Sequence, residues 1–230
     1  MLMTLKLTKN FAILYGIMLG DGCLSFTSKR KKLIFIAGSL KDDIPFFENI
    51  VKPILESLIN KDIPIRHRPK IGAINLFFSN VKLYDYMVSM GFPVGKKGDR
   101  LFIPRIFYEK NLVKQVISGF FATDGSLVLT DNNGTLYPRV EANGIAKNLI
   151  KEISDYLNSV GIKSNLYLAK RKKPSSYGGQ EQYRIQINGK DNLKKFVKLI
   201  GFVNPKQNER LSYYYKKMAP PRIELGTSAL

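Results

Sequence analysis

The stretch "LYGIMLGDG", Leu14–Gly22, decides the fold of this chain of 230 residues. It is an apolar run with glycines at Gly16 and Gly20, and it ends in the carboxylate of Asp21. Small residues four positions apart lie on one face of a helix and let a second helix approach closely. The stretch therefore predicts a helix over about 8–19 that packs tightly against another helix and carries a carboxylate at its end.

The same pattern returns 103 residues later as "ISGFFATDG", Ile117–Gly125, with Asp124 in the place of Asp21. The flanks agree as well. "DGCLSFT" is answered by "DGSLVLT", and "GFPVGKKGDRL" over 91–101 is answered by "GFVNPKQNERL" over 201–211. Agreement of several segments in the same order predicts an internal duplication.

Side-by-side packing of the two motif helices would bring Asp21 and Asp124 to one point. Like charges repel, and a divalent cation, which prefers oxygen ligands, relieves that repulsion. Such acidic pairs serve phosphodiester hydrolysis by holding metal against the attacking and leaving oxygens. A single Asp-Gly after an apolar helix is ordinarily only a helix end, but two copies in a duplicated chain favour the functional interpretation.

The charge balance points to a polyanionic partner. Lys and Arg number 37 against 18 Asp and Glu, which gives a net charge of +19, and nucleic acid is the foremost candidate. One cysteine and one histidine exclude a zinc finger and an intramolecular disulfide framework. The apolar runs are too short to span a membrane and the N-terminus is unlike a signal peptide. We therefore expect a soluble intracellular protein that is not secreted and has no membrane partner. The sequence does not distinguish a prokaryotic cytoplasm from an organelle.

Both copies show the element order α-β-β-α-β-β-α. After the first motif helix we expect a hairpin around "SKRKK", a proline-interrupted helix over 41–59, a second hairpin over 63–79 and a short helix over 81–91. In the second copy we expect helices over 111–122, 146–160 and 190–200, with strands near 126–130, 138–143, 163–171 and 181–188. The expected organisation is an N-terminal half over 1–92, a linker over 93–110, a C-terminal half over 111–212, and a tail over 213–230 that lacks periodicity and is partly disordered.

With these paired motifs the chain resembles the LAGLIDADG homing endonucleases, in their single-chain form with two motifs, over about 8–211. The resemblance implies an α+β fold of two pseudo-symmetric αββαββα halves, whose antiparallel, saddle-shaped sheets lie in the major groove of double-stranded DNA. It implies a site-specific endonuclease that hydrolyses one phosphodiester bond in each strand of a long asymmetric target. It also implies a monomer with no obligate protein partner.

The resemblance further implies that Asp21 and Asp124 bind Mg²⁺, that Mn²⁺ substitutes for it, and that Ca²⁺ supports binding without cleavage. The backbone carbonyls of Gly20 and Thr123 would add metal ligands. Thr123 departs from the Gly or Ala that is usual in the family at this position, so a looser helix contact is expected there.

Two lysines hold the same place in the repeated pattern G-F-x3-K-x3-R-L, namely Lys96 and Lys206. Basic residues near the scissile phosphates are typical of the family, and these two are predicted to stabilise developing charge or to help activate water. A generic phosphate contact or an ordinary solvated side chain is the alternative, as it is for Arg100 and Arg210.

The predicted base-reading side chains alternate along strands with apolar residues, and suit hydrogen bonding to purine edges. They are Gln182, Arg184, Gln186 and Asn188 in the second half, and Ser25, Thr27, Arg66, Arg68 and Lys70 in the first. The other predicted DNA contacts come mainly from the basic turns "SKRKK" and "AKRKKP", which suit phosphates. They are Lys29, Arg30, Lys31, Lys32, Arg139, Lys170, Arg171 and Lys172. An ordinary solvated sheet face is the alternative for these strands.

Two other functions fit the same resemblance. One is a maturase that binds intron RNA, and the other is a cleavage-inactive DNA-binding protein, against which the presence of both aspartates argues. Residence in an intein is disfavoured, since the chain neither begins with Cys or Ser nor ends in His-Asn.

Overall fold

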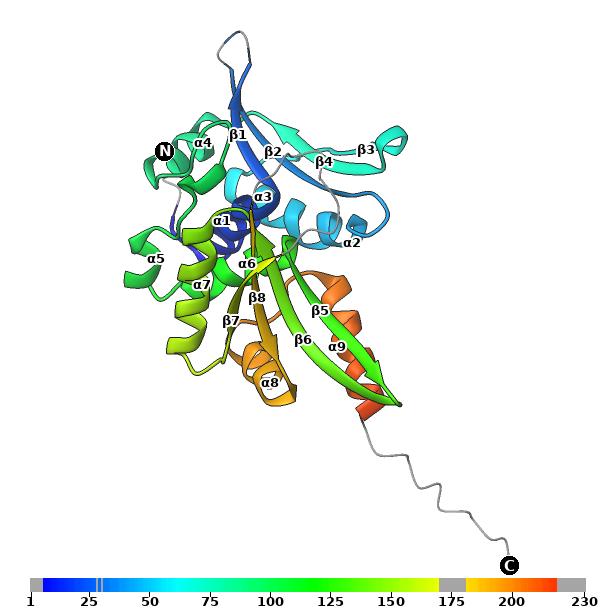
Figure 1. Cartoon of the computed structure of the whole chain (residues 1–230). Helices are drawn as coiled ribbons and strands as arrows, with labels where there is room; N and C mark the ends of the chain where they lie inside the picture. The colour runs from blue at the N-terminus through cyan, green and yellow to red at the C-terminus, as the bar shows by residue number, and fades with distance from the viewer. Residues whose placement is uncertain (1–5, 28, 30, 170–180, 219–230) are drawn as a thin grey trace, which may run out of the picture.

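The computed structural model describes residues 6–27, 29, 31–169 and 181–218. These residues form two halves of the same design, each with one four-stranded antiparallel sheet and helices packed on it, which confirms the predicted α+β class. In Figure 1 the first-half sheet lies above a central pair of helices and the second-half sheet lies below it. No helix in the described residues is long and apolar enough to cross a membrane.

The first half has the strand order β1-β2-β4-β3. Its strands are β1 (Gly22–Phe26), β2 (Lys32–Ser39), β3 (Ile65–Arg68) and β4 (Ala73–Phe78). Its helices are α1 (Lys9–Asp21), α2 (Ile44–Phe46), the π-helical η1 (Phe47–Val51), α3 (Lys52–Ile59), the short η2 (Pro69–Ile71) and α4 (Val81–Ser89). The predicted proline-interrupted helix is the continuous run α2-η1-α3. Pro45 lies in the first turn of α2, where a missing N–H costs little, and Pro53 follows the π-helical η1.

The second half repeats this topology with the order β5-β6-β8-β7. Its strands are β5 (Gly125–Asn132), β6 (Thr135–Gly144), β7 (Asn165–Ala169) and β8 (Gln182–Asn188). Its helices are α6 (Val113–Thr123), α7 (Lys147–Ser159), α8 (Lys190–Leu199) and α9 (Pro205–Met218). Between the halves lie η3 (Gly98–Arg100) and α5 (Arg105–Glu109).

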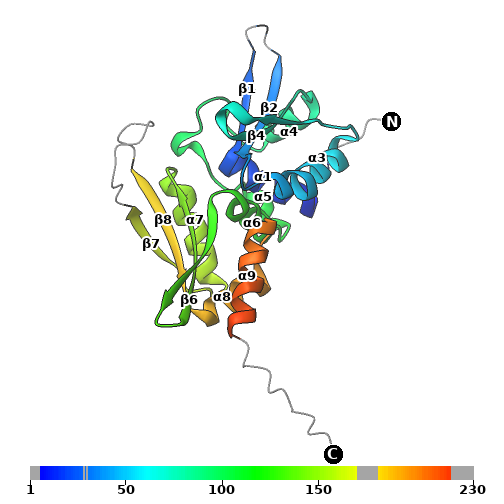
Figure 2. The ribbon, with the colours of Figure 1, turned by 90° about the vertical axis from the view of Figure 1, so that its right-hand side faces the viewer.

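The central pair consists of α1 and α6, which Figure 2 shows between the two halves from the side. Their backbones touch at the predicted small residues. A Cβ on Gly16 would overlap the carbonyl oxygen of Val116, and a Cβ on Gly119 would overlap that of Ile13. The looser contact expected at Thr123 is not found. The Thr123 hydroxyl occupies the place that a Cβ on Gly20 of α1 would take. Because Gly20 has no side chain, the larger threonine fits.

No helix is predicted after 190–200, but α9 spans Pro205–Met218 and continues into the segment predicted to be a tail without periodicity. Its sequence "PKQNERLSYYYKKM" is mostly polar, and few positions face the core. Gln207 and Tyr214 are buried, and they hold the helix beside β5 and β6. One buried face is enough to fix a helix whose apolar periodicity is too weak to predict it. The remainder of the predicted tail, 219–230, lies outside the described residues.

Candidate active site

The two motif carboxylates lie where the central helices end. Asp21 is the last residue of α1, and Asp124 directly follows α6, with its backbone N–H donating to the carbonyl of Phe120 at 3.0 Å. The Asp124 carboxylate reaches across the helix pair, since a Cβ built on Gly20 would lie 2.9 Å from its Oδ2. The structure thus brings together two carboxylates that are far apart in the sequence.

Both carboxylates are costly to ionise in this position. Loss of hydration raises the pKa of Asp124 to about 7, and repulsion from Asp21 adds to the rise while the Lys97 ammonium opposes it. Loss of hydration also raises the pKa of Asp21 to about 6, although Asp21 is exposed and water can reach it. Lys97 lowers that pKa and the Asp43 carboxylate raises it. Binding of a cation would remove part of the cost of ionising the pair.

A lysine that the repeat pattern did not single out, Lys97, binds the end of α1. Its Nζ donates to the carbonyl oxygens of Met18 at 3.3 Å, Leu19 at 3.0 Å and Gly20. These carbonyls belong to the last turn of the helix, where no intrahelical partner is available and where the helix dipole favours a cation. Lys97 therefore offsets the unfavourable placement of a carboxylate, Asp21, at a helix C-terminus.

The charge of the same ammonium lowers the pKa of both aspartates. Loss of hydration lowers the pKa of Lys97, while the charges of Asp124, Asp21 and Cys23 raise it, in that order of strength. Its hydrogen bonds join it to the first half, but its strongest charge partner belongs to the second. Lys97 thus connects the two halves of the site electrostatically.

The structure does not place Lys96, the predicted catalytic lysine of the first half, in this site. Lys96 is exposed, and its carbonyl oxygen accepts a hydrogen bond from Arg100. The neighbouring Lys97 is half-buried and takes the central position. The repeat pattern was misleading because it keeps the first lysine of "KK" in both copies, whereas the position that enters the site is the second.

The end of α6 is bound by neutral amides instead of an ammonium. The Gln207 side-chain nitrogen donates to the carbonyls of Phe121 at 2.7 Å and Gly125 at 2.9 Å. The Asn204 side-chain nitrogen donates to the carbonyl of Ala122 at 2.9 Å. Both amide side chains are buried.

In the repeated pattern Gln207 stands where the first half has Lys97. The predicted second lysine, Lys206, forms an ion pair with Asp42 of the first half at 3.3 Å. Asp42 belongs to the segment between β2 and α2, so this pair joins the halves at the edge of the site. The catalytic role predicted for Lys206 stays a prediction.

A cavity of about 310 Å³ opens beside the carboxylate pair. Its polar lining includes Lys97, Asp124, Asn143 and Gln182, and apolar side chains of α1, α6 and α7 form the rest of its wall. Gln182, predicted to read bases, thus lies close to the catalytic candidates. The cavity places a charged and hydrogen-bonding surface next to the two aspartates.

The donor set at the helix ends fits a hard divalent cation that is shared with a substrate. Among the described residues no cluster of three or more His, Cys, Asp and Glu side chains forms a metal cage. Mg²⁺ is commonly held by one or two carboxylates together with substrate phosphates and water, and Asp21 and Asp124 match that pattern. The Gly20 carbonyl, predicted as a further ligand, accepts a hydrogen bond from the Lys97 ammonium, and its role as a metal ligand stays a prediction. The Thr123 carbonyl stays a prediction.

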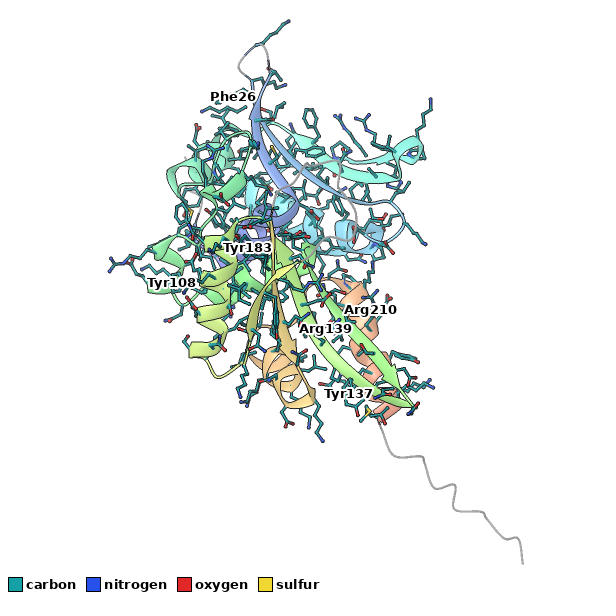
Figure 3. All side chains as sticks on the ribbon, viewed as in Figure 1. Phe26, Tyr108, Tyr137, Arg139, Tyr183 and Arg210 are labelled. Atoms are coloured by element: carbon teal, nitrogen blue, oxygen red, sulfur yellow. The ribbon has the colours of Figure 1, made fainter. Side chains whose placement is uncertain are left out.

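Most of the predicted base-reading residues of the second half lie on one sheet face. In β8, Ile185 and Ile187 are buried, so Arg184, Gln186 and Asn188 point to the opposite, open face. Two arginines on this face are held by neighbouring side chains. Arg139 Nε donates to the Glu141 carboxylate at 2.9 Å, and Arg184 Nε donates to the Asn143 side-chain oxygen at 2.7 Å. Figure 3 shows Arg139 on β6, with Arg210 on the neighbouring α9. Their contact with bases stays a prediction.

The first sheet has an equivalent open face with a different lining. Its register places Ser25 on β1 and Arg66 and Arg68 on β3 on this face, as predicted. Lys70 does not continue the alternation, because β3 ends at Arg68 and Lys70 lies in η2. Thr27 lies in the turn after β1, where its hydroxyl accepts the backbone N–H of Lys31 at 3.0 Å.

Of the predicted phosphate contacts, Lys29 and Lys31 are exposed at the β1–β2 turn. Lys32 instead faces α4, where it pairs with Asp85 and lies 5.6 Å from the ring centroid of Tyr84. The structure therefore assigns Lys32 to packing within the first half. The remaining predicted contacts lie outside the described residues: Arg30, Lys170, Arg171 and Lys172.

Comparison with known proteins agrees with this architecture. Residues 111–201 match the model of the LAGLIDADG-like domain. The replication factor C small subunit of Thermococcus kodakarensis is 24% identical over 206 residues, which cover 89% of this chain and 21% of that protein. The chain thus spans about a fifth of the length of this curated relative, and the likeness concerns one segment of it.

Several solved structures share the fold. The homing endonuclease I-DmoI in complex with DNA and Mn has 20% identity and a TM-score of 0.58, with 84% of this chain and 96% of that chain covered. The same enzyme with DNA and Ca has 18% identity and a TM-score of 0.59, with 90% and 97% covered. The I-LtrWI LAGLIDADG homing endonuclease bound to target DNA has 9% identity and a TM-score of 0.61, with 91% and 90% covered. At such identities the likeness establishes the fold.

Proposed function

We propose that this chain, which carries a LAGLIDADG-like domain in its second half and has the fold of the single-chain LAGLIDADG homing endonucleases, is a site-specific, divalent-metal-dependent DNA endonuclease. One observation carries the proposal. Asp21 and Asp124, one from each half, lie together at the ends of two tightly packed helices, and both have raised pKa values that the Lys97 charge counteracts. A merely structural helix pair has no need of two carboxylates that are costly to ionise.

The chain's own residues have separable roles in the proposed reaction. Asp21 and Asp124 would hold Mg²⁺, which supplies charge neutralisation at the phosphate oxygens and a more acidic bound water. Lys97, whose three N–H groups donate to the α1 carbonyls, keeps a positive charge beside the carboxylates that would stabilise the charge developing on the phosphate. The glycines of α1 and α6 let the two backbones meet, and this close contact would set the separation of the two aspartates.

The proposed substrate is a long, asymmetric double-stranded DNA site. The net charge of +19 supplies the attraction to phosphates, and the two open sheet faces end beside the carboxylates. The relatives with solved DNA complexes support this partner. Because one chain supplies both carboxylates, we expect it to act as a monomer.

The test is selection from a random duplex DNA library in Ca²⁺, followed by incubation of the selected duplex in Mg²⁺ or in EDTA. We expect one dominant sequence, double-strand cleavage only with Mg²⁺, and affinity that falls steeply as salt rises. A selected duplex that is bound but never cut would support a cleavage-inactive DNA-binding protein. Failure to select any duplex, together with tight binding of structured intron RNA, would support a maturase.

A further inference from the structure

Equivalent positions on the two open sheet faces differ in chemistry. In each half, the second residue after the motif aspartate is paired with a residue on the next strand, and that residue is paired with one on the third strand. Each set of three neighbouring side chains forms a row across the sheet. The rows are Cys23, Phe35 and Phe77 in the first half, and Ser126, Glu141 and Gln186 in the second. Since the two rows start at the same distance from their aspartates, they face equivalent parts of a DNA site.

The first-half row is aromatic. The rings of Phe35 and Phe77 meet edge to face with centroids 6.3 Å apart, and the Arg66 guanidinium lies 5.2 Å from the Phe77 centroid. The neighbouring residues Ile34 and Ile36 are fully buried on the helix-covered face, so the two rings point to the open face. Both phenylalanines are half-buried and keep accessible surface there.

A hollow of about 320 Å³ extends from this row. Leu33 and Phe77 contribute apolar surface to it, and Lys31, Lys61 and Arg66 contribute cations. The carboxylate in its lining, Asp62, is paired with Lys52 at 2.8 Å. Leu33 shares the open face, because it pairs with Ser25 in the register of β1 and β2. Apolar surface among cations, on a sheet that ends at the active site, matches the edge of a base pair flanked by phosphates.

The second-half row has the opposite character. The Glu141 carboxylate accepts a hydrogen bond from Arg139 Nε at 2.9 Å, and Gln186 is paired with Glu141 across β6 and β8. These side chains offer donors and acceptors to base edges. Hydrogen-bonding pairs such as Arg with guanine and Gln with adenine distinguish bases in the major groove.

The base-edge group of the major groove that apolar side chains recognise is the C5-methyl of thymine. We propose that the first half of this protein reads its part of the target through thymine methyl groups at Phe35 and Phe77, whereas the second half reads its part through hydrogen bonds. The inference rests on the DNA binding in the proposed function and adds the chemistry by which each half-site is recognised.

The experiment uses the full chain and the duplex selected by binding in Ca²⁺. Each thymine is replaced in turn by deoxyuridine, which removes only the methyl group, and the Kd is measured by titration of labelled duplex. We expect at least one thymine in the half-site of the first sheet whose methyl loss raises Kd about fourfold, as burial of one methyl-sized group predicts. In Phe77→Ala the same replacement should leave Kd unchanged, since the methyl has lost its partner.

The matched control is Gln186→Ala at the equivalent position of the second half. It should weaken binding of the selected duplex but keep the uracil penalty of the first half-site. The inference is overturned if no uracil penalty disappears in Phe77→Ala, or if the first half-site lacks thymine. Binding without cleavage would overturn only the proposed endonuclease activity, whereas failure to select any duplex would overturn both.

Discussion

The ends of the two motif helices are built on the same plan but carry different charge. At the end of α1 an ammonium, Lys97, binds three carbonyls, whereas at the end of α6 the amides of Gln207 and Asn204 bind three others. Two carboxylates and one ammonium leave a net negative charge, which attracts a divalent cation. A second ammonium in place of Gln207 would cancel it. Duplication inside one chain therefore allows an asymmetry that two identical subunits cannot have.

The largest effect is expected from the aspartates themselves. Asp21→Asn or Asp124→Asn should each lower double-strand cleavage in Mg²⁺ about a thousandfold or more, equivalent to roughly 4 kcal/mol of barrier, because either change removes a charged ligand. Affinity for the selected duplex in Ca²⁺, measured by titration, should persist. Asp155→Asn, which changes an exposed aspartate on α7, should cut normally. Full cutting by either folded site variant would remove that aspartate from the mechanism.

The next effect separates the two adjacent lysines. Lys97→Met should lower the cleavage rate about a hundredfold, since it removes the charge beside both carboxylates. Cleavage by the wild type should fall as the pH drops below about 7, because Asp124 must be ionised. Lys97 lowers the pKa of Asp124, so the variant should lose activity at a higher pH. The control is Lys96→Met, whose rate and pH profile should stay close to those of the wild type.

In the contact between α1 and α6, an alanine that overlaps backbone atoms should lower the free energy of unfolding more than an alanine that overlaps a side chain. Gly16→Ala should lower the free energy of unfolding by about 3 kcal/mol, since its Cβ would meet the Val116 carbonyl. Gly20→Ala meets the Thr123 hydroxyl instead, and Thr123→Ala should restore much of its loss. Urea unfolding followed by circular dichroism measures all of these. If Gly16→Ala and the double variant Gly20→Ala/Thr123→Ala lost equal free energy of unfolding, the close backbone contact at Gly16 would be contradicted.

The smallest effect concerns stability without metal. The folded-state pKa of Asp124 is raised from the ordinary 3.8 to about 7, so the folded protein binds a proton more tightly than the unfolded chain does. This group's contribution therefore becomes less favourable as pH rises from about 4 to about 7. Asp124→Asn should raise the free energy of unfolding by about 1–2 kcal/mol at pH 8 and leave it little changed at pH 4. A gain that is independent of pH would contradict this account.

Local patterns determined much of the architecture. The repeated glycine-bearing runs predicted the two motif helices and their aspartates, and alternation predicted most of the strands and the open face that carries Arg184, Gln186 and Asn188. These features depend on periodicity along a few neighbouring residues, which the sequence displays directly. Helix α9 was not predicted, because its one buried face depends on contacts with β5 and β6.

The tertiary structure alone decided which groups meet the carboxylates. Lys96 and Lys97 are adjacent cations in the sequence, and only the path of the segment after α4 turns the second one onto the carbonyls of α1. Likewise, the sequence alone does not distinguish Phe35 and Phe77 from other strand residues. The register of β2 and β4 places their rings together on the open face. The sequence determined that two carboxylates would converge, because helix packing is encoded locally by small residues. The charge and shape around them depend on contacts between segments distant in the chain, which no local pattern contains.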